Sequence, residues 1–438
     1  MLTINGSVQW SLFVDQLIAT MCVCRISPFH SQQHRTSSCF HCLATSDTLK
    51  TCTGCRHLHF CGKECQRAAW LSHKSECRSL QKIPHKQPPS LLLLLARLLR
   101  GVAAGTIAET KINALSSQPE TVEESLKKKF TELLQMLKVF ELDGETLAME
   151  SAMELLCKVT SNSFSICNSE LQNIGTGVYT DVACFNHSCR PNCAAVFEGL
   201  TLQIRTILPV EDNEELTISY IDIQLPTIER RILLSKQYSF ICTCARCVSG
   251  GFLTKPNNDK QLRALLCRQQ DCHSTMYPLF EFGPRMGEFT CNGCGFVEDV
   301  QDRIAKFITT CNSFGSKTES SMPRKKELLQ KELALAEIVL ASTHHRLCSI
   351  LNSLTDACIA LGEWETAYVF ATRSTKALRS AVPPESPTLG VELARIAKLS
   401  HYLGHLNESV AAFESAIEIL TNSHGASHLI VSDLQVRL

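Results

Sequence analysis

The eight residues Asn186-His187-Ser188-Cys189-Arg190-Pro191-Asn192-Cys193 place amide, imidazole and thiol groups within one short segment. Pro191 prevents a regular helix, because proline lacks the backbone N–H that a helix interior needs. Polar and soft side chains at this density are unusual in a hydrophobic core. The segment therefore predicts a functional site around which the rest of the chain is organised.

Two later segments carry related signals. The run Glu214-Glu215-Leu216-Thr217-Ile218-Ser219-Tyr220 alternates in the manner of a strand and ends in a tyrosine. Phe240 is followed closely by Cys242-Thr243-Cys244-Ala245-Arg246-Cys247, which holds three thiols. The three segments together are far more specific for a site than any one of them.

Composition limits the classes of protein to which the chain can belong. Its 438 residues suffice for two to four domains, and 43 basic residues balance 43 acidic ones. Without a net charge, no overall field draws the chain to nucleic acid or to a membrane. Residues 91–99 are leucine-rich but too short to span a bilayer, and Arg97 interrupts them, so we expect a buried helix.

The 24 cysteines occur mostly as short-spaced pairs mixed with histidines. Disulfide scaffolds are usually short secreted chains with a signal peptide, and residues 1–38 lack the apolar run of such a peptide. The pairs therefore favour metal binding in a reducing compartment, the cytoplasm and nucleus, over disulfides. The short, interrupted leucine run argues in addition against a membrane protein.

Residues 39–77 contain the densest set of pairs. Zinc binds four thiolate or imidazole ligands in a tetrahedron, so eight ligands predict two sites. In a cross-braced arrangement one site takes Cys39, Cys42, Cys61 and Cys65, and the other takes Cys52, Cys55, His73 and Cys77. The spacing resembles the MYND zinc finger. His57 and His59 are expected to be bystanders.

Periodicity outlines the remaining chain. Residues 121–160 have the apolar stripe of amphipathic helices, residues 162–167 begin a strand, and residues 196–207 alternate as a strand does. Gly175-x-Gly177 is expected at a turn or bulge between strands. From Lys325 onward the chain reads as helical, and Leu361-Gly362 and Leu403-Gly404 recur 42 residues apart, which resembles tetratricopeptide-like hairpins.

These segments together resemble a known family. Asn162-Ser163-Phe164, the Asn186 to Cys189 segment, the strand ending at Tyr220 and the Cys242-x-Cys244-x2-Cys247 run look like a SET domain with its post-SET motif. With the finger upstream, the chain resembles the SET- and MYND-domain protein-lysine methyltransferases. The resemblance implies an α+β fold: a SET-domain β-core with an inserted MYND finger, a post-SET zinc motif and a C-terminal α-helical tetratricopeptide-like lobe.

The expected division of the chain follows from this resemblance. Residues 1–38 would be an atypical, partial N-terminal SET segment, and residues 39–77 the finger. Residues 78–240 would form the SET core with a helical insert. Residues 241–300 would hold the post-SET motif and a zinc ribbon, and residues 301–438 the tetratricopeptide-like domain.

The resemblance also implies a site for S-adenosylmethionine and lysine. The implied cofactor-binding residues are Asn113, Asn162, Asn186, His187, Tyr220 and Phe240. Tyr220 would be catalytic, with its hydroxyl aimed at the transferring methyl group. Phe164 and Tyr179 would line the substrate channel.

Two further zinc sites are expected, and both are structural because four protein ligands leave no open position. The third would use Cys189, Cys242, Cys244 and Cys247, with Cys193 as a rival ligand. The fourth would use Cys267, Cys272, Cys291 and Cys294, against the alternative of free thiols on a loop. That fourth site is not common to the whole family.

The predicted activity is methylation of lysine in histones or other proteins, as in a chromatin regulator. The alternative is a catalytically impaired scaffold, because residues 1–38 contain Gly6 alone where SET domains begin with a Gly-x-Gly cofactor motif. By resemblance, the finger would bind proline-rich peptides and the helical lobe a heat-shock chaperone. A DNA-binding transcription factor is disfavoured, because the chain has neither net positive charge nor a basic stripe.

Overall fold

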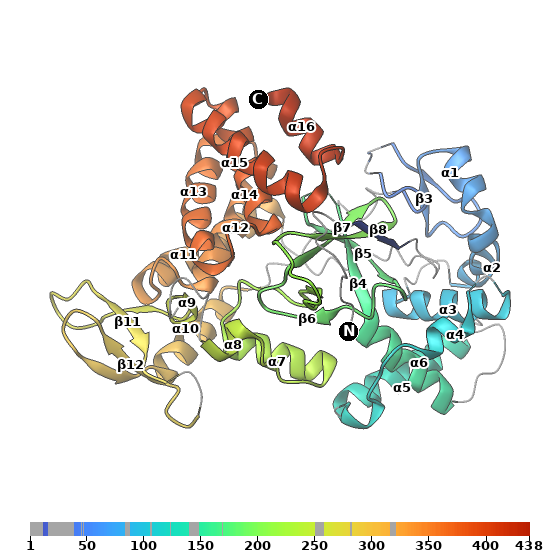
Figure 1. Cartoon of the computed structure of the whole chain (residues 1–438), viewed down its shortest axis with the longest axis horizontal. Coiled ribbons are helices and arrows are strands. Elements are labelled where there is room, and N and C mark those ends of the chain that lie inside the picture. Colours follow the sequence, from blue (N-terminus) through green and yellow to red (C-terminus); the bar gives the residue numbers. More distant parts are fainter. Residues whose placement is uncertain are drawn as a thin grey trace.

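A computed structural model describes residues 12–15, 39–44, 46, 48–83, 88–105, 107–122, 124–139, 149–168, 170–249, 258–280, 283–315 and 321–438 (Figure 1). Short strands occupy its middle. A small cysteine-rich module lies on one side of them, and a stack of helices lies on the other. Gly6 and most of residues 1–38, including Cys22 and Cys24, fall outside the described residues.

The cysteine-rich module is built from short elements. These are β2 (Lys50–Thr51), β3 (His59–Phe60), α1 (Lys63–Ala68) and α2 (Trp70–Gln81). The two strands pair in antiparallel fashion, and Ala69 separates the two helices. Residues 66–70 therefore lie in helices, with a break at Ala69.

A helical segment follows the module. It consists of α3 (Ser90–Ala103), α4 (Glu109–Asn113), a 3-10 turn (Pro119–Thr121), α5 (Glu124–Val139) and α6 (Met149–Asn162). The leucine-rich run is the buried helix that was expected, since Leu94, Leu95 and Leu98 are almost fully inaccessible. On α5 the predicted stripe also points inward, with Phe130 and Leu134 buried.

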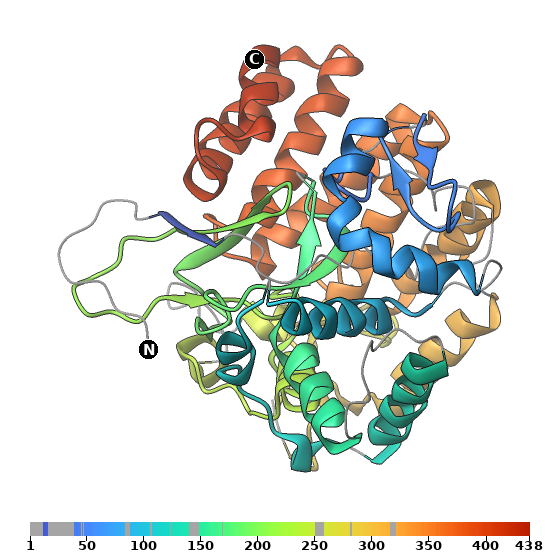
Figure 2. The same ribbon diagram turned by 90° about the vertical axis from the view of Figure 1, so that its right-hand side faces the viewer.

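The central strands form three small sheets. The elements are β1 (Leu12–Asp15), β4 (Ser163–Cys167), β5 (Asn173–Val178), β6 (Asn186–His187), β7 (Cys193–Glu198), β8 (Thr201–Thr206) and β9 (Thr217–Ile218). Their orders are β1-β8-β7, β4-β5 and β6-β9, of which only the last is parallel. Strand β1 lies along the β7–β8 hairpin in Figure 2, so residues 1–38 contribute a strand to the central sheet.

Three details differ from the sequence-based expectations. Gly175 and Gly177 lie inside β5, and the register irregularity of that strand pair lies beside them, opposite Ile166 and Cys167. Residues 196–207 are a hairpin, which turns at Gly199 with φ +60°. Only two residues of the 214–220 run form a strand, because the rest is held by side-chain contacts described below.

The chain then leaves the central strands through α7 (Thr227–Tyr238), α8 (Ala245–Ser249) and α9 (Asn258–Gln261). An antiparallel sheet follows, made of β10 (Leu265–Leu266), β11 (Thr275–Pro278), β12 (Glu288–Cys291) and β13 (Val297–Asp299). Its buried residues Met276 and Phe289 share one core with Phe307 of α10 (Gln301–Ser313). This sheet is therefore anchored to the helices that come after it.

The C-terminal lobe is helical. Its elements are α11 (Met322–Val339), α12 (His345–Ala360), α13 (Trp364–Ala381), α14 (Pro387–Tyr402), α15 (Leu406–His424) and α16 (Leu429–Arg437). Antiparallel neighbours meet at the two predicted Leu-Gly turns, where Gly362 has φ +74° and Gly404 has φ +79°. The next N–H reaches back to close each helix end, from Glu363 to the Cys358 carbonyl and from His405 to the Ser400 carbonyl.

The helical lobe also contacts the central strands. Helix α15 packs on β7 and β8, and His428 Nε2 donates to the carbonyl oxygen of Phe197 at 3.4 Å. Helix α15 and the β7–β8 hairpin lie side by side in both views. Among the helices of the described segments, none combines the length and apolar character needed to cross a bilayer.

Replacing Gly404 by alanine should lower the free energy of unfolding of the helical lobe by about 1–2 kcal/mol, because an L-residue is strained in the left-handed region. Urea denaturation followed by circular dichroism measures the change. The matched control is Asn407→Ala, at an exposed position in the first turn of α15. Equal stability of the two variants would contradict the proposed role of the turn.

Candidate functional site

Four groups of four ligands come together in the structure. They are Cys39, Cys42, Cys61 and Cys65; Cys52, Cys55, His73 and Cys77; Cys189, Cys242, Cys244 and Cys247; and Cys267, Cys272, Cys291 and Cys294, and we refer to them as the first to fourth clusters. Within each cluster all ligand atoms lie within 4.8 Å of one another. The cross-braced pairing expected for the finger is the one observed.

The spacing within the clusters fits zinc. With Zn–S bonds of about 2.3 Å, two sulfurs of a tetrahedral site are about 3.8 Å apart. A sulfur and an imidazole nitrogen on the same ion are about 3.6 Å apart, because the Zn–N bond is shorter. The Sγ atoms of Cys52 and Cys77 are 3.8 Å apart, and Cys55 Sγ lies 3.6 Å from His73 Nε2. Corresponding S–S distances in the other clusters run from 3.5 to 4.0 Å.

The second cluster is oriented by a buried ion pair. His73 presents Nε2 to the cluster and donates through Nδ1–H to Glu76 at 3.4 Å. Glu76 in turn pairs with Arg97 of α3 at 2.6 Å, and all three side chains are buried. Burial raises the pKa of the Glu76 carboxyl, but Arg97 and His73 outweigh burial and hold that pKa below its usual range. The arginine that interrupts the leucine run thus connects the finger to α3.

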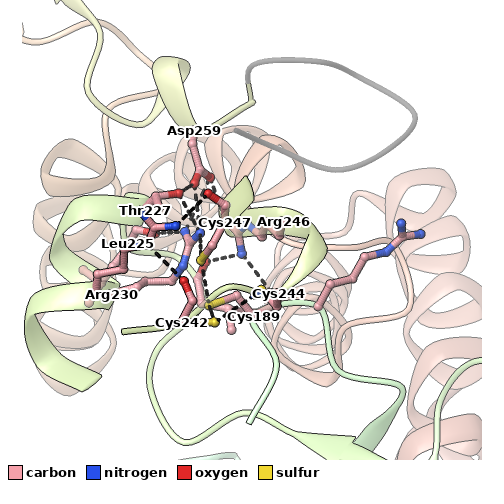
Figure 3. Close-up of polar contacts among 12 residues, drawn as sticks. Cys189, Leu225, Thr227, Arg230, Cys242, Cys244, Arg246, Cys247 and Asp259 are labelled. Carbon is pink, nitrogen blue, oxygen red and sulfur yellow. Dashed lines mark hydrogen bonds and ion pairs between the residues drawn. The ribbon is translucent and has the colours of Figure 1, made fainter. Parts of the chain in front are cut away.

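The third cluster joins Cys189, in the Asn186–Cys193 segment, to the three cysteines after α7 (Figure 3). Cys189 Sγ lies 4.0 Å from Cys242 Sγ and 3.5 Å from Cys247 Sγ. Cys193 is not in the cluster; it is buried in the core of the central strands. The expected choice of Cys189 over Cys193 therefore agrees with the geometry.

Two buried arginines and an aspartate lie beside the third cluster in Figure 3. Arg230 donates to Asp259 at 2.9 Å and to Cys247 Sγ at 3.5 Å. Arg246 donates to the other oxygen of Asp259 at 3.0 Å. Burial raises the pKa of Asp259, but the two guanidinium groups outweigh burial and hold that pKa below its usual range.

The fourth cluster has the local geometry of a zinc knuckle. Gly293 donates its N–H to Cys291 Sγ at 3.4 Å, and Gly295 adopts the left-handed conformation with φ +70°. A Cβ on Gly293 would lie 2.1 Å from Ser274 Oγ, so only glycine fits there. The backbone is therefore shaped around the thiols, as expected for a metal site and not for free thiols on a loop.

The segment Asn186–Cys193 lies against the 214–220 run. Strand β6 pairs in parallel with β9, and Ser188 donates its N–H to the Ile218 carbonyl at 2.9 Å. Asn192 then brackets the same run: its amide donates to the Glu215 carbonyl and its oxygen accepts from Thr217 N–H at 2.8 Å. A few hydrogen bonds, several of them from side chains, thus hold these two segments together without a long run of strand pairing.

His187 is fixed as a neutral ring. Its Nδ1 accepts the backbone N–H of Tyr220 at 3.1 Å, so the ring proton lies on Nε2, which is 3.2 Å from Cys189 Sγ. Burial lowers the pKa of His187 to about 4. The ring lies 5.3 Å from that of Tyr220 and 6.1 Å from that of Phe240. The third cluster, His187 and Tyr220 are therefore one connected unit.

Tyr220 lines a cavity of about 340 Å³. Its hydroxyl donates to the Phe185 carbonyl, and burial raises its pKa to about 12. Tyr238, which the sequence analysis did not single out, lies with its ring 4.9 Å from that of Tyr220 and lines the same cavity. The sequence feature that could have indicated Tyr238 is its position two residues before Phe240, at the end of α7.

The cavity lies between the central strands and the helical lobe. Phe164 lines it from β4, and His424 lines it from the end of α15. The described lining residues carry no Asp, Glu, Lys or Arg: Ser161, Asn162, Ser163, Phe164, Ser165, Cys167, Asn168, Leu171, Ala183, Ala195, Val196, Phe197, Ser219, Tyr220, Gln237, Tyr238 and His424. Burial lowers the pKa of His424 to about 3, so its imidazole is neutral as well.

The other expected site residues occupy different positions. Asn162 donates to the carbonyl of Ser116, and Lys158 donates to the carbonyl of Asn113, so α6 holds the end of α4 beside the start of β4. The Asn113 side chain is exposed, and so is that of Asn186, whose amide donates to Glu215.

Tyr179 is separate from the cavity lining. It is 0% exposed, its hydroxyl donates to the Leu200 carbonyl at 2.9 Å, and its ring packs edge-on against Phe164. In this structure it supports Phe164 from behind, because its ring and hydroxyl are both occupied by protein contacts.

Comparison with known proteins finds one family match and relatives that span most of the chain. The family described as MYND finger matches residues 39–77. The chain is 27% identical over 417 residues to histone-lysine N-methyltransferase SMYD3 of Homo sapiens, covering 90% of this chain and 86% of that protein. Histone-lysine N-methyltransferase ASHR1 of Arabidopsis thaliana is 27% identical over 428 residues, covering 92% and 86%.

Further matches extend over similar lengths. N-lysine methyltransferase SMYD2-A of Xenopus laevis is 23% identical over 411 residues, covering 92% of this chain and 89% of that protein. A solved structure of TPR-like repeats from a Podosopora anserina kinesin light chain covers 31% of this chain and 64% of that chain, with 18% identity and a TM-score of 0.24. That last match has no weight for the fold.

Metal analysis of the purified chain should give four zinc ions per molecule, one for each cluster. Cys272→Ser should reduce the content by one, because three remaining ligands hold zinc poorly. The control is Cys184→Ser, at an exposed thiol outside the clusters. Unchanged zinc in Cys272→Ser would rule out the fourth site.

Glu76→Gln should weaken zinc binding at the second cluster by about 10–100-fold, because groups that orient a ligand imidazole contribute this much to metal affinity. Competition with a chromophoric chelator measures the loss. The control, Glu64→Gln, changes an exposed carboxylate in the first turn of α1. If the two variants released zinc alike, the role given to the ion pair would be wrong.

Proposed function

We propose that this chain, a member of the SET- and MYND-domain protein-lysine methyltransferase family, transfers a methyl group from S-adenosylmethionine to lysine side chains of histones or other proteins. The observation that carries the proposal is the unit of His187, Tyr220 and Tyr238, connected to a four-thiolate cluster and open to a neutral cavity. The relatives span nearly the whole chain, which supports the same activity for all its parts together.

The residues proposed for the cofactor suit its chemistry. The exposed amides of Asn113 and Asn186 offer polar groups for an amino acid and a ribose. Half-buried Asn162 offers its amide oxygen, because its nitrogen already donates to the Ser116 and Lys158 carbonyls. Phe240 offers an aromatic face next to His187 for a flat adenine. Bound there, the cofactor would supply an electrophilic methyl group on a sulfonium.

The lysine amine must be neutral when it attacks. A wall without charged groups disfavours the ammonium form and so lowers the pKa of an entering lysine. With the cofactor bound, methyl transfer would be an in-line displacement, in which the N–C bond would form as the S–C bond breaks, the sulfur would leave as a thioether, and the product ammonium would release a proton. Holding both reactants in line contributes several kcal/mol by saving orientational entropy.

Tyr220 would act as a positioned neutral phenol. With its pKa raised to about 12 it stays protonated near neutral pH, so it is not a general base. Its proton is engaged by the Phe185 carbonyl, which leaves the oxygen lone pairs to accept from the methyl group and the amine. Tyr238 and Phe164 would form the channel walls, and Tyr179 would support Phe164.

The remaining parts would serve recognition. The finger has Trp70 and Leu71 exposed on α2, a surface suited to a proline-rich peptide. The helical lobe would supply one wall of the substrate cleft and a surface for a chaperone. Among the cysteines that the structure describes, none forms a disulfide, which is consistent with the proposed cytoplasmic and nuclear location.

The division of labour would follow the domain limits expected from the sequence, with the SET core at residues 78–240. The Gly-x-Gly question concerns residues 1–38, of which the structure describes only β1. Because the curated relatives named above are methyltransferases, the enzyme is preferred over a scaffold.

Calorimetry should detect S-adenosylmethionine binding by the zinc-loaded chain, and Tyr220→Phe should keep that affinity while lowering kcat on a lysine-containing protein by about 100-fold. Loss of one positioned hydrogen-bonding group at the reacting atoms typically lowers kcat by about 100- to 1000-fold. The matched control is Tyr402→Phe, at an exposed position of the helical lobe.

Two outcomes would contradict the proposal. Absence of binding at millimolar cofactor would eliminate the enzyme and leave the scaffold. Full activity of Tyr220→Phe would show that the hydroxyl has no part in the transfer.

A further inference from the structure

The third cluster differs from the others in how its charge is balanced. Zinc with four thiolates keeps two surplus negative charges, and burying them is costly without compensation. Cys189, Cys242 and Cys247 are buried, whereas the first and fourth clusters each have exposed ligands such as Cys42 and Cys294. A buried four-thiolate site therefore needs cations close by.

Two arginines meet this requirement. Arg230 and Arg246 are 0% and 1% exposed. Arg230, on α7, donates directly to the ligand atom Cys247 Sγ, and it also reaches Thr227 at 2.8 Å. Arg246 lies between the ligands Cys244 and Cys247 in sequence and donates to the carbonyl oxygen of Cys189 at 3.3 Å. Both positive charges thus lie in the shell around the metal.

Arg246 also reaches the helical lobe. Its Nη2 donates to the carbonyl oxygen of Ala381, the last residue of α13, at 3.1 Å. Its Nη1 donates to the Ile223 carbonyl at 2.8 Å, in the loop after Tyr220. One planar guanidinium therefore connects the cluster, the Tyr220 loop and the C-terminal lobe, which a point charge such as lysine could not do with the same geometry.

Asp259 makes the two arginines act together. One carboxylate oxygen accepts from Arg230 at 2.9 Å, and the other accepts from Arg246 at 3.0 Å and from Arg230 at 3.4 Å. Thr227 donates to the same carboxylate. A single carboxylate against two guanidiniums leaves one positive charge for the thiolates. The position of the arginines thus depends on the metal as well as on Asp259.

We infer that Arg230, Arg246 and Asp259 form a latch through which zinc in the third cluster locks the helical lobe onto the central strands. The latch keeps the lobe, and with it His424, at the wall of the cavity that Tyr220 lines. Its residues are positioning residues. The link between zinc and the lobe stands apart from the activity, whereas any effect on turnover rests on the proposed methyl transfer.

Arg246→Met tests the latch on the full, zinc-loaded chain. Without the guanidinium, a chelator should extract the zinc of the third cluster about 10–100-fold faster, as for other groups next to a metal ligand. Hydrogen exchange at residues 378–382 and 424–428 should also become faster. Arg246→Lys should release zinc more slowly than Arg246→Met, because it restores the positive charge. Its hydrogen exchange should stay fast, because lysine lacks the planar guanidinium that donates to several carbonyls at once.

The reverse direction is tested by removing the metal. Cys242→Ser should take zinc from the third cluster and speed exchange at residues 378–382, because coupling between two sites is reciprocal. Cys42→Ser, which removes zinc from the first cluster, should leave that exchange unchanged. Arg285→Met, at a side chain 63% exposed, is the control for loss of an arginine.

The outcomes separate the latch from its rivals. Faster exchange in Arg246→Met with unchanged zinc release would make Arg246 a lobe contact only, and faster zinc release with unchanged exchange would make it a zinc neighbour only. Either result overturns the inference. Under the proposed activity, Arg246→Lys should raise KM for the protein substrate more than it lowers kcat, and an inactive wild type would refute that activity while leaving the latch to the exchange data.

Discussion

The gathering of the Cys189, Cys242, Cys244 and Cys247 thiols, in an arrangement that can hold one metal ion, is the constraint on which most of the site depends. Cys189 ties down the segment with Asn186 and His187, and the other three thiols tie down the chain that follows Tyr238 and Phe240. His187 is then held between a ligand sulfur and the backbone of Tyr220. A ligand bond of this kind replaces the long strands that would otherwise hold such short elements in place.

The surroundings of each cluster show how one metal chemistry serves different ends. In the second cluster Glu76 orients the histidine ligand, and Arg97 of α3 balances the negative charge of Glu76. In the third, the Arg230 guanidinium donates to a ligand sulfur and the Arg246 guanidinium donates to the backbone of another ligand. In the fourth, backbone N–H groups and glycines carry the geometry. The number of ligands is the same, but burial decides which outer groups are needed, because a buried charge has no water to stabilise it.

Much of the architecture could be predicted from local patterns. Pairs such as Cys61/Cys65 indicate metal ligands because adjacent turns bring their sulfurs together. The buried helix at residues 91–99 and the left-handed turns at Gly362 and Gly404 follow from periodicity and from the freedom of glycine. Gly175-x-Gly177 was expected at a turn or bulge between strands; both glycines lie inside β5, next to the register irregularity of the β4–β5 pair, because glycine in a strand and glycine in a turn look alike without the partner strand.

The sequence by itself determined the ligand sets, the helical lobe and the position of the Asn186–Cys193 segment, because these depend on residues close in the chain or on a ligand type that only metal explains. Tertiary structure alone decided that Arg97 reaches Glu76, that Asp259 joins Arg230 to Arg246, and that Tyr238 and His424 share a cavity with Tyr220. Each of these contacts joins separate elements of the fold. A charged or aromatic side chain has no periodicity that names its distant partner, and burial, which makes such contacts strong, exists only once the chain is packed.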